Sequence, residues 1–225
     1  IILCEEIEEE VNKRAIQNVQ ICKDDWDSFE VSKDFCKHPL TSDKVKKIEI
    51  AFSEWKQLCE ERYTKLKNNE EWLNEQFIRL YSLQQELSSK IENRHIAVRL
   101  SDRERDIKSL LSFAVGCLFG RYSVERADTV AKDIIDSDNI IPITDEAYLK
   151  DDIVSKLCDW LKVVYGEEYL EDNLDYIADS LSVKGKSSRE VIRNYFMKEF
   201  FGEHCKIYQK RPIYWLFDSG KQNGF

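Results

Sequence analysis

The sequence predicts a mainly α-helical protein, a multi-helix and bundle-like module with a few short β-strands or a small hairpin near the C-terminus. Three observations support this fold class. Only 7 glycines and 3 prolines occur among the 225 residues, which argues against disorder, collagen and turn-dense all-β folds. Apolar residues recur at three- and four-residue spacing over long stretches, as they do on one face of a helix. Hydrophobic residues make up 42% and charged residues 34%, a balance typical of a globular chain with a core.

The N-terminal part of the chain is expected to form three helices. The first covers about residues 2–23 and carries one apolar stripe, so it resembles a docking or linker helix with one face to bury. Residues 43–67 and 69–88 then predict an antiparallel helical hairpin with a break at Asn68 and Asn69. A continuous coiled coil is the rival interpretation, but the aromatic content favours globular packing. The stripe on the first helix consists of Leu3, Ile7, Val11, Ala15 and Val19.

Helix caps can be recognised in the second half of the chain. In a capping box, a hydroxyl at the helix start accepts a hydrogen bond from the backbone three residues later. Ser101 with Glu104 fits this pattern, and Ser187 with Glu190 fits it again. Between these two boxes, an aspartate at position 151 or 152 is expected to start a further helix.

Glycines mark the expected ends of two helices, and three segments are expected to form short strands. Gly166 and Gly202 are placed to end two helices, whereas Gly116 lies inside an apolar helix and should permit close packing. That helix is apolar nearly all round, so it should be the most buried one. Short strands or a hairpin are expected at residues 96–100, 139–143 and 207–217.

These elements indicate three parts of the chain. Residues 1–23 form the linker or docking helix, residues 24–94 a helical hairpin subdomain, and residues 95–225 a mainly helical C-terminal subdomain. Within the last part, residues 184–211 are basic, with eight lysines and arginines against three glutamates in a chain of net charge -9. Such charge asymmetry is typical of a surface that meets phosphate groups.

The basic segment, residues 184–211, is therefore a candidate nucleic-acid contact. Aromatic residues lie among its cations, and a helix start at Ser187 offers backbone N–H groups suited to an anion. An ordinary surface is the alternative, in which the aromatics are core residues and the cations pair with acidic groups elsewhere. The candidate contacts are Lys184, Lys186, Arg189, Arg193, Lys206, Lys210 and Arg211.

No catalytic residue and no metal site is expected. Residues 185–187 read Gly-Lys-Ser, but a phosphate-binding loop also needs a glycine at position 180, where Ser180 stands, and a preceding strand. The histidines at 38, 95 and 204 are scattered, and His204 is expected at a helix end near the negative end of the dipole.

The cysteines and the N-terminus predict a cytoplasmic location. The 7 cysteines lack metal-binding spacing, and we interpret them as reduced thiols, with Cys59, Cys117 and Cys158 in the core. Acidic residues occupy positions 5, 6 and 8–10, where a secretory leader would be basic and then apolar. The longest apolar stretch, residues 109–120, is too short to span a membrane.

Several strings in the sequence resemble a known family in their order and spacing. The strings include residues 25–30, 33–35, 39–40, 69–71, 73–74, 104–109, 114–117, 119–123, 139–145, 188–193, 210–217 and 219–221. From about residue 7 onward, they resemble the C-terminal helical region of PglX-type adenine-specific DNA methyltransferases of BREX phage-defence systems. The family often has a longer insert at the place where this sequence has only residues 124–138.

The resemblance implies a longer enzyme that transfers a methyl group from S-adenosylmethionine to the exocyclic amine of adenine in DNA. The family's Asn-Pro-Pro-aromatic motif cannot occur here, because Pro39, Pro142 and Pro212 are isolated, and no Gly-rich cofactor loop is present. No catalytic residue can be carried over, no cofactor is expected in this chain, and whether the chain is itself an enzyme is left open.

The function expected from this resemblance is a non-catalytic helical region of such a methyltransferase. It would brace the target-recognition part and contact the DNA backbone, without any membrane partner. The alternative is a protein-interaction scaffold that docks other defence-system subunits without touching DNA. The acidic surplus over residues 1–183 favours this alternative, because it should repel phosphate.

Overall fold

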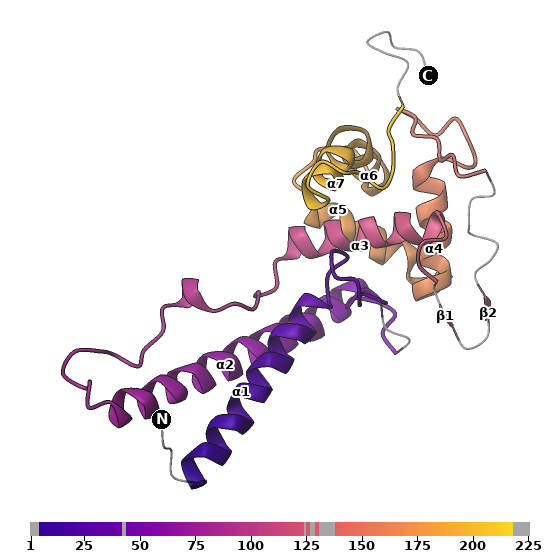
Figure 1. Ribbon diagram of the computed structural model, residues 1–225. Coiled ribbons are helices and arrows are strands. Elements are labelled where there is room, and N and C mark those ends of the chain that lie inside the picture. Colours follow the sequence, from indigo (N-terminus) through magenta and orange to yellow (C-terminus); the bar gives the residue numbers. More distant parts are fainter. Residues whose placement is uncertain (1–4, 42–43, 124, 127–128, 131–137, 218–225) are drawn as a thin grey trace. The chain divides into compact units, whose positions relative to one another are not determined.

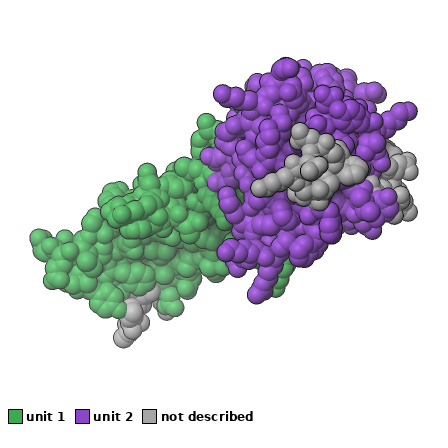
Figure 2. Space-filling model, turned by 90° about the horizontal axis from the view of Figure 1, so that it is seen from above, with its two compact units in different colours: residues 1–34, 54–101 green, residues 35–53, 102–225 purple. Residues whose placement is uncertain are grey.

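The computed structural model describes residues 5–41, 44–123, 125–126, 129–130 and 138–217. The chain divides into two compact units, coloured separately in Figure 2. Unit 1 contains residues 1–34 and 54–101, and unit 2 contains residues 35–53 and 102–225. Each unit has its own internal packing. The predicted division into residues 1–23, 24–94 and 95–225 stays a prediction.

Unit 1 is built on two long helices that run side by side in opposite directions, drawn in indigo and purple in Figure 1. They are α1 (Glu5–Trp26) and the part of α2 (Ile48–Leu80) that follows residue 53. A 3₁₀ turn, η1 (Asn93–His95), lies in the segment after α2. Leu66, Ile96 and Val98 form the buried core of this unit, and Ile21, Cys22, Tyr63 and Ile91 pack against it.

The predicted break in the middle of α2 is wrong, because the helix continues through residues 68 and 69. Asn69 is fully buried and faces α1. Its Oδ1 accepts a hydrogen bond from Arg14 Nη1 at 3.0 Å, and its Nδ2 donates to Asn18 Oδ1 at 2.8 Å. Asparagine is a weak helix former, but these bonds to the neighbouring helix stabilise it in place.

The apolar stripe predicted on α1 does not form the contact with α2. Val19 in that stripe is 70% exposed, and Leu3 lies outside the described residues. The contact face instead carries Arg14, whose guanidinium lies 4.4 Å from the centre of the Trp72 ring, together with the polar residues around Asn69. Polar contacts therefore join this part of α1 to α2, Ile21 and Cys22 add apolar packing near the end of α1, and Ile16 and Val19 stay on the surface.

Unit 2 packs its helices around α3 (Arg103–Leu118). The last half of α3 is buried on all sides, as predicted for the most apolar helix. Gly116 permits this packing, because a Cβ atom there would lie 2.6 Å from the Tyr122 ring. The other elements of unit 2 are α4 (Ile153–Tyr165), η3 (Glu167–Tyr169), α5 (Leu170–Ser180), α6 (Ser188–Tyr195), the π-helical turn η4 (Phe196–Phe200) and α7 (Phe201–Ile207).

Aromatic rings fill the centre of unit 2. The Phe113 ring on α3 stacks on Tyr122 at 5.1 Å between centroids and meets Phe35 and Trp160 edge to face. The buried Tyr165 hydroxyl donates to the Leu40 carbonyl at 3.1 Å, which ties α4 to the loop before α2. Aromatic pairs in these geometries add to the free energy gained by burial alone.

Most of the predicted caps are confirmed, with one shift along the sequence. Asp152 caps α4 by accepting from Ser155 N at 2.8 Å, and Gly166 ends that helix with a φ of 103°. Asp102, one residue after the expected Ser101, caps α3. Gly202 does not end a helix, because it lies inside α7.

The expectation of short β-strands or a C-terminal hairpin is wrong at all three predicted places. All three segments lie within the described residues, and none forms a strand. The described strands are the two-residue pieces β1 (Glu125–Arg126) and β2 (Thr129–Val130), paired antiparallel where no strand was predicted. The rest of residues 124–137 lies outside the described residues.

Each failed strand prediction has a local physical reason. Residues 96–100 alternate between apolar and other side chains because Ile96 and Val98 pack in the core of unit 1. The backbone nitrogen of Arg99 donates to an Asp25 carboxylate at 3.4 Å and not to a neighbouring strand. In the second segment, the Pro142 carbonyl accepts a bond from Ile153 N at the start of α4. In the third, α7 continues to Ile207, and two residues with positive φ, Gln209 and Lys210, then turn the chain.

Replacing Asn69 with alanine should destabilise unit 1. The substitution leaves the buried donors and acceptors of α1 without their partner, which costs about 1–3 kcal/mol in the free energy of unfolding. Urea denaturation of Asn69→Ala checks this. The neighbouring Asn68 is exposed, so Asn68→Ala is the matched control and should change stability by under about 0.5 kcal/mol. Equal effects of the two substitutions would contradict the structural role of Asn69.

Candidate nucleic-acid interface

The structure separates the seven candidate contacts into three groups. The first group contains five exposed residues: Lys184 and Lys186 before α6, Lys206 in the last turn of α7, and Lys210 and Arg211 in the turn that follows. None of these five forms an ion pair with another residue that the structure describes. They flank the two ends of the continuous helical run from α6 to α7, which at 1.5 Å per residue extends up to about 30 Å.

Arg193 forms a group of its own because it is buried. Its Nη2 lies 2.5 Å from Asp152 Oδ2, and its Nη1 donates to the Thr144 carbonyl at 2.9 Å. Asp152 also caps α4, so this single ion pair joins α6 to the start of α4 and to the loop before it. Arg193 therefore supports the fold and is not placed to reach a phosphate group outside.

Arg189 in the first turn of α6 is exposed but already paired. Its Nη1 and Nη2 donate to the two oxygens of Glu171, at 2.8 and 2.6 Å. A bidentate pair between guanidinium and carboxylate has a fixed geometry. Arg189 thus joins α6 to α5, and a phosphate group would have to displace Glu171 to reach it.

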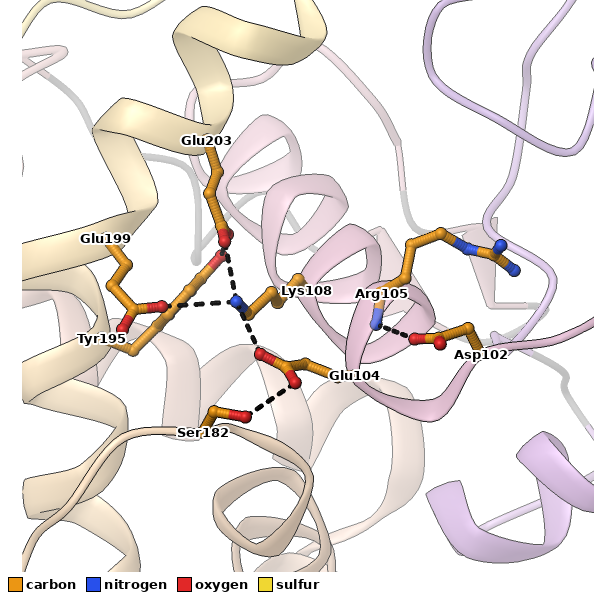
Figure 3. A network of polar contacts seen from close by, with 8 residues as sticks. All are labelled: Asp102, Glu104, Arg105, Lys108, Ser182, Tyr195, Glu199 and Glu203. Carbon is orange, nitrogen blue, oxygen red and sulfur yellow. Dashed lines mark hydrogen bonds and ion pairs between the residues drawn. The ribbon is translucent and has the colours of Figure 1, made fainter.

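Two glutamates of the basic segment form ion pairs with Lys108 on α3, as Figure 3 shows. Lys108 Nζ lies 2.8 Å from Glu104, 3.3 Å from Glu199 and 2.7 Å from Glu203. Tyr195 adds a hydrogen bond from its hydroxyl to Glu203 Oε2 at 2.9 Å. One ammonium group therefore holds two of the three glutamates of the basic segment.

The charges around Lys108 shift the pKa values of the groups involved. Desolvation by burial lowers the pKa of Lys108, but hydrogen bonds with Glu104 and Glu203 outweigh it and raise that pKa above its ordinary value. The pKa of Glu104 is lowered, first by its hydrogen bond with Lys108 and then by that with Ser182, whose hydroxyl donates to it at 2.7 Å. Both groups are held in their charged forms.

The third glutamate of the segment, Glu190, serves the start of α6. Ser187 Oγ accepts from Glu190 N at 3.3 Å, as the capping box predicts, and Glu190 Oε2 accepts from Lys186 N at 2.8 Å. A Cβ atom on Gly185 would lie 2.7 Å from Val191 N, so glycine is needed there for close backbone packing. The Gly-Lys-Ser string thus has a structural explanation. The Glu190 carboxylate accepts the backbone N–H that a bound anion would otherwise use.

A cation and ring cluster around His204 was missed from the sequence. Arg121 Nη1 donates to the Tyr208 hydroxyl at 2.8 Å, and its guanidinium also lies over the Tyr122 ring at 4.8 Å. The Tyr214 ring stacks on His204 at 4.9 Å between centroids. In the sequence, this cluster is indicated only by Arg121 standing directly before Tyr122. An arginine beside a tyrosine is too common on protein surfaces to predict a cluster.

His204 lies in the last turn of α7, at a helix end as predicted, and its side chain is buried there. Its Nε2 accepts hydrogen bonds from the backbone nitrogens of Ile213 at 2.9 Å and Tyr214 at 3.3 Å. Burial, and then the charge of Arg121, lower the pKa of His204. His38 is also buried, and desolvation lowers its pKa to about 3. Both imidazoles are therefore neutral at pH 7.

The predicted core thiols Cys59, Cys117 and Cys158 are buried and are not joined in disulfide bonds. Among the described residues, no group of three or more His, Cys, Asp or Glu side chains is arranged to hold a metal ion. Within the same part of the chain, no helix combines the length and the apolar character needed to cross a membrane.

Comparison with known proteins identifies what this chain resembles. No model of a known protein family matches it. The adenine-specific methyltransferase PglX of Lacticaseibacillus casei (strain Zhang) is 39% identical over 222 residues, covering 90% of this chain. The adenine-specific methyltransferase BrxX of Escherichia coli O9:H4 (strain HS) is 31% identical over 256 residues, covering 96%. The chain is homologous to one part of the PglX-type adenine-specific methyltransferases.

The matched part is a small share of these methyltransferases. The chain spans 18% of the length of the PglX relative and 21% of that of the BrxX relative. The resemblance to PglX-type enzymes inferred from the sequence strings is therefore confirmed. The expected place of this part, at the C-terminal end of such an enzyme, stays a prediction.

Replacing Lys108 with methionine should destabilise unit 2 by roughly 2 kcal/mol at pH 7, because three carboxylates lose their shared cation. The lowered pKa of Glu104 gives stability that is present above its ordinary value of 4.5 and is lost as the pH falls through the folded value. The deficit of Lys108→Met should therefore shrink below about pH 4.

Chemical denaturation at pH 7 and at about pH 3 measures this deficit. Lys198→Met is the matched control, because Lys198 is an exposed lysine on the adjacent turn η4. We expect the control to change stability by under about 0.5 kcal/mol at both pH values. A deficit for Lys108→Met that is independent of pH would contradict the role of the ammonium as a shared cation.

Proposed function

We propose that this chain is a non-catalytic helical region of an S-adenosylmethionine-dependent, adenine-specific DNA methyltransferase that serves in phage defence. It braces the target-recognition part of that enzyme and contacts the DNA backbone through the exposed cations of the basic segment. The homology to PglX and BrxX supports the methyltransferase context. Methyl transfer and cofactor binding are assigned to the rest of the enzyme, and the enzyme acts in the cytoplasm.

One observation carries the proposed DNA contact: the glutamates of the basic segment are engaged by other groups of unit 2, whereas five of its candidate cations are exposed and form no ion pair with a described residue. Glu199 and Glu203 bind Lys108, and Glu190 caps α6. The segment's own glutamates therefore do not pair with its exposed lysines or with Arg211. Exposed lysine and arginine side chains without acidic neighbours are what a phosphate backbone requires.

The proposed contacts position the enzyme and do not read a sequence. Hydrogen bonds and ion pairs to phosphate oxygens fix orientation on a duplex but carry little base information. The five exposed candidates, Lys184, Lys186, Lys206, Lys210 and Arg211, are all suited to such contacts. Base recognition and base flipping would then belong to other parts of a PglX-type enzyme.

A second candidate function is a docking scaffold for other defence-system subunits without DNA contact. It is favoured by the surface of α1, where Ile16 and Val19 are 69% and 70% exposed. Apolar side chains at this spacing on one helix are typical of a face that binds a partner helix. The scaffold function predicts that duplex DNA is not bound even at low salt.

The decisive experiment is duplex-DNA binding by the 225-residue chain across a salt series. We expect the logarithm of the binding constant to fall linearly with the logarithm of the salt concentration. Alanine at Lys184, Lys186, Lys206, Lys210 and Arg211 should reduce the slope by up to about 4.5, since each phosphate contact contributes about 0.9. Fluorescence anisotropy with a labelled duplex measures both quantities.

A charge-matched control separates specific contacts from net charge. Alanine at five other exposed cations makes the same change in total charge, and this control variant should keep most of the slope. Absence of binding by the unchanged chain at low salt would refute the DNA contact and favour the scaffold function. The control positions are Lys33, Lys56, Lys65, Arg94 and Lys150.

A further inference from the structure

The segment Ile213–Phe217, here called the aromatic segment, exposes large apolar side chains at the surface of unit 2. Trp215 is 72% and Phe217 is 90% exposed, and Leu216 is also on the surface. Such exposure of adjacent large side chains is unfavourable in water, and apolar surface of this kind marks a binding site more often than isolated exposed residues do.

The aromatic segment is held in place at its start. The backbone nitrogens of Ile213 and Tyr214 both donate to His204 Nε2 on α7. The Tyr214 ring is stacked on His204 and also on Phe119, with ring centroids 4.9 Å apart in each case. Trp215 follows this anchor directly, so its side chain is presented from a fixed backbone and a ligand would not have to order it.

Cations surround the same segment. Lys210 and Arg211 precede it and are exposed, and Lys206 is exposed one turn earlier on α7. Arg121 Nη1 donates to the Tyr208 hydroxyl at 2.8 Å; burial lowers the pKa of Arg121, but this hydrogen bond and the neighbouring tyrosines outweigh burial and raise that pKa. Its guanidinium is therefore permanently charged beside the anchor. Aromatic rings beside a group of cations are complementary to nucleic acid, which offers base faces and phosphates together.

We propose that the aromatic segment is a stacking site for unpaired DNA bases, with Trp215 as its central ring and Lys210 and Arg211 on the neighbouring phosphates. The proposal deepens the proposed function and rests on it, because it adds single-stranded or unpaired bases to the backbone contacts. A protein partner is disfavoured because the flanking Lys206 and Lys210 belong to a residue type that is depleted in protein interfaces.

The test compares three labelled probes with the 225-residue chain in anisotropy titrations at low salt. The probes are a 15-nucleotide oligo-dT, an abasic backbone of the same length and charge, and a 15-base-pair duplex. We expect the oligo-dT to bind about tenfold more tightly than the abasic strand, since stacking adds to each phosphate contact. Trp215→Ala should remove this difference and leave the affinity for the abasic strand unchanged, whereas Trp215→Phe should keep most of it.

The outcomes distinguish this proposal from the one on which it rests. Equal affinity for oligo-dT and the abasic strand overturns base stacking, while salt-dependent binding of both strands and the duplex leaves the backbone contact standing. No binding of any probe overturns both proposals. The matched control is Trp26→Ala, because Trp26 is an exposed tryptophan in unit 1. A loss of the oligo-dT preference in the control as large as that in Trp215→Ala would also overturn the proposal.

Discussion

The ammonium group of Lys108 decides which charges of the C-terminal helices reach the surface. It binds Glu199 and Glu203 as well as Glu104, and so turns two of the three glutamates of the basic segment towards α3. The π-helical turn η4 contributes Glu199 to this arrangement, and such turns often occur at functional sites. Without this central cation, the three carboxylates would repel one another, and acidic groups would compete with DNA for the lysines on the outside.

A second constraint explains why counting cations in the sequence overstates the number of available phosphate ligands. Arg193 lies in the same basic segment as Lys184 and Lys186, but it is buried against Asp152, while Arg189 holds Glu171. Removing either partner of the buried pair would leave an uncompensated charge, which is strongly destabilising. The two arginines therefore stabilise the fold, and the exposed lysines together with Arg211 remain for binding.

The helical fold class, the caps at Asp152 and Ser187 and the burial of α3 could be predicted because each depends on residues close in the sequence. The break in α2 and the three strands could not, because their outcome depends on distant partners. Asn69 is stabilised inside a helix by Arg14 and Asn18, and His204 turns residues 213–214 back towards α7. The cluster of Arg121 with Tyr208 likewise joins residues that are 87 positions apart.

The charge distribution also restricts how DNA could approach this part of a PglX-type enzyme. The chain has a net charge of -9, although its basic segment carries five more positive than negative groups, so the other residues are strongly acidic. Acidic surfaces repel a phosphate backbone over about one Debye length, roughly 8 Å at physiological salt. Repulsion elsewhere and attraction at the basic segment would together orient a duplex, and the anchored Trp215 lies directly after that segment. Phosphate contact and base stacking would then act on the same stretch of DNA, and orientation would follow from the acidic residues as much as from the basic ones.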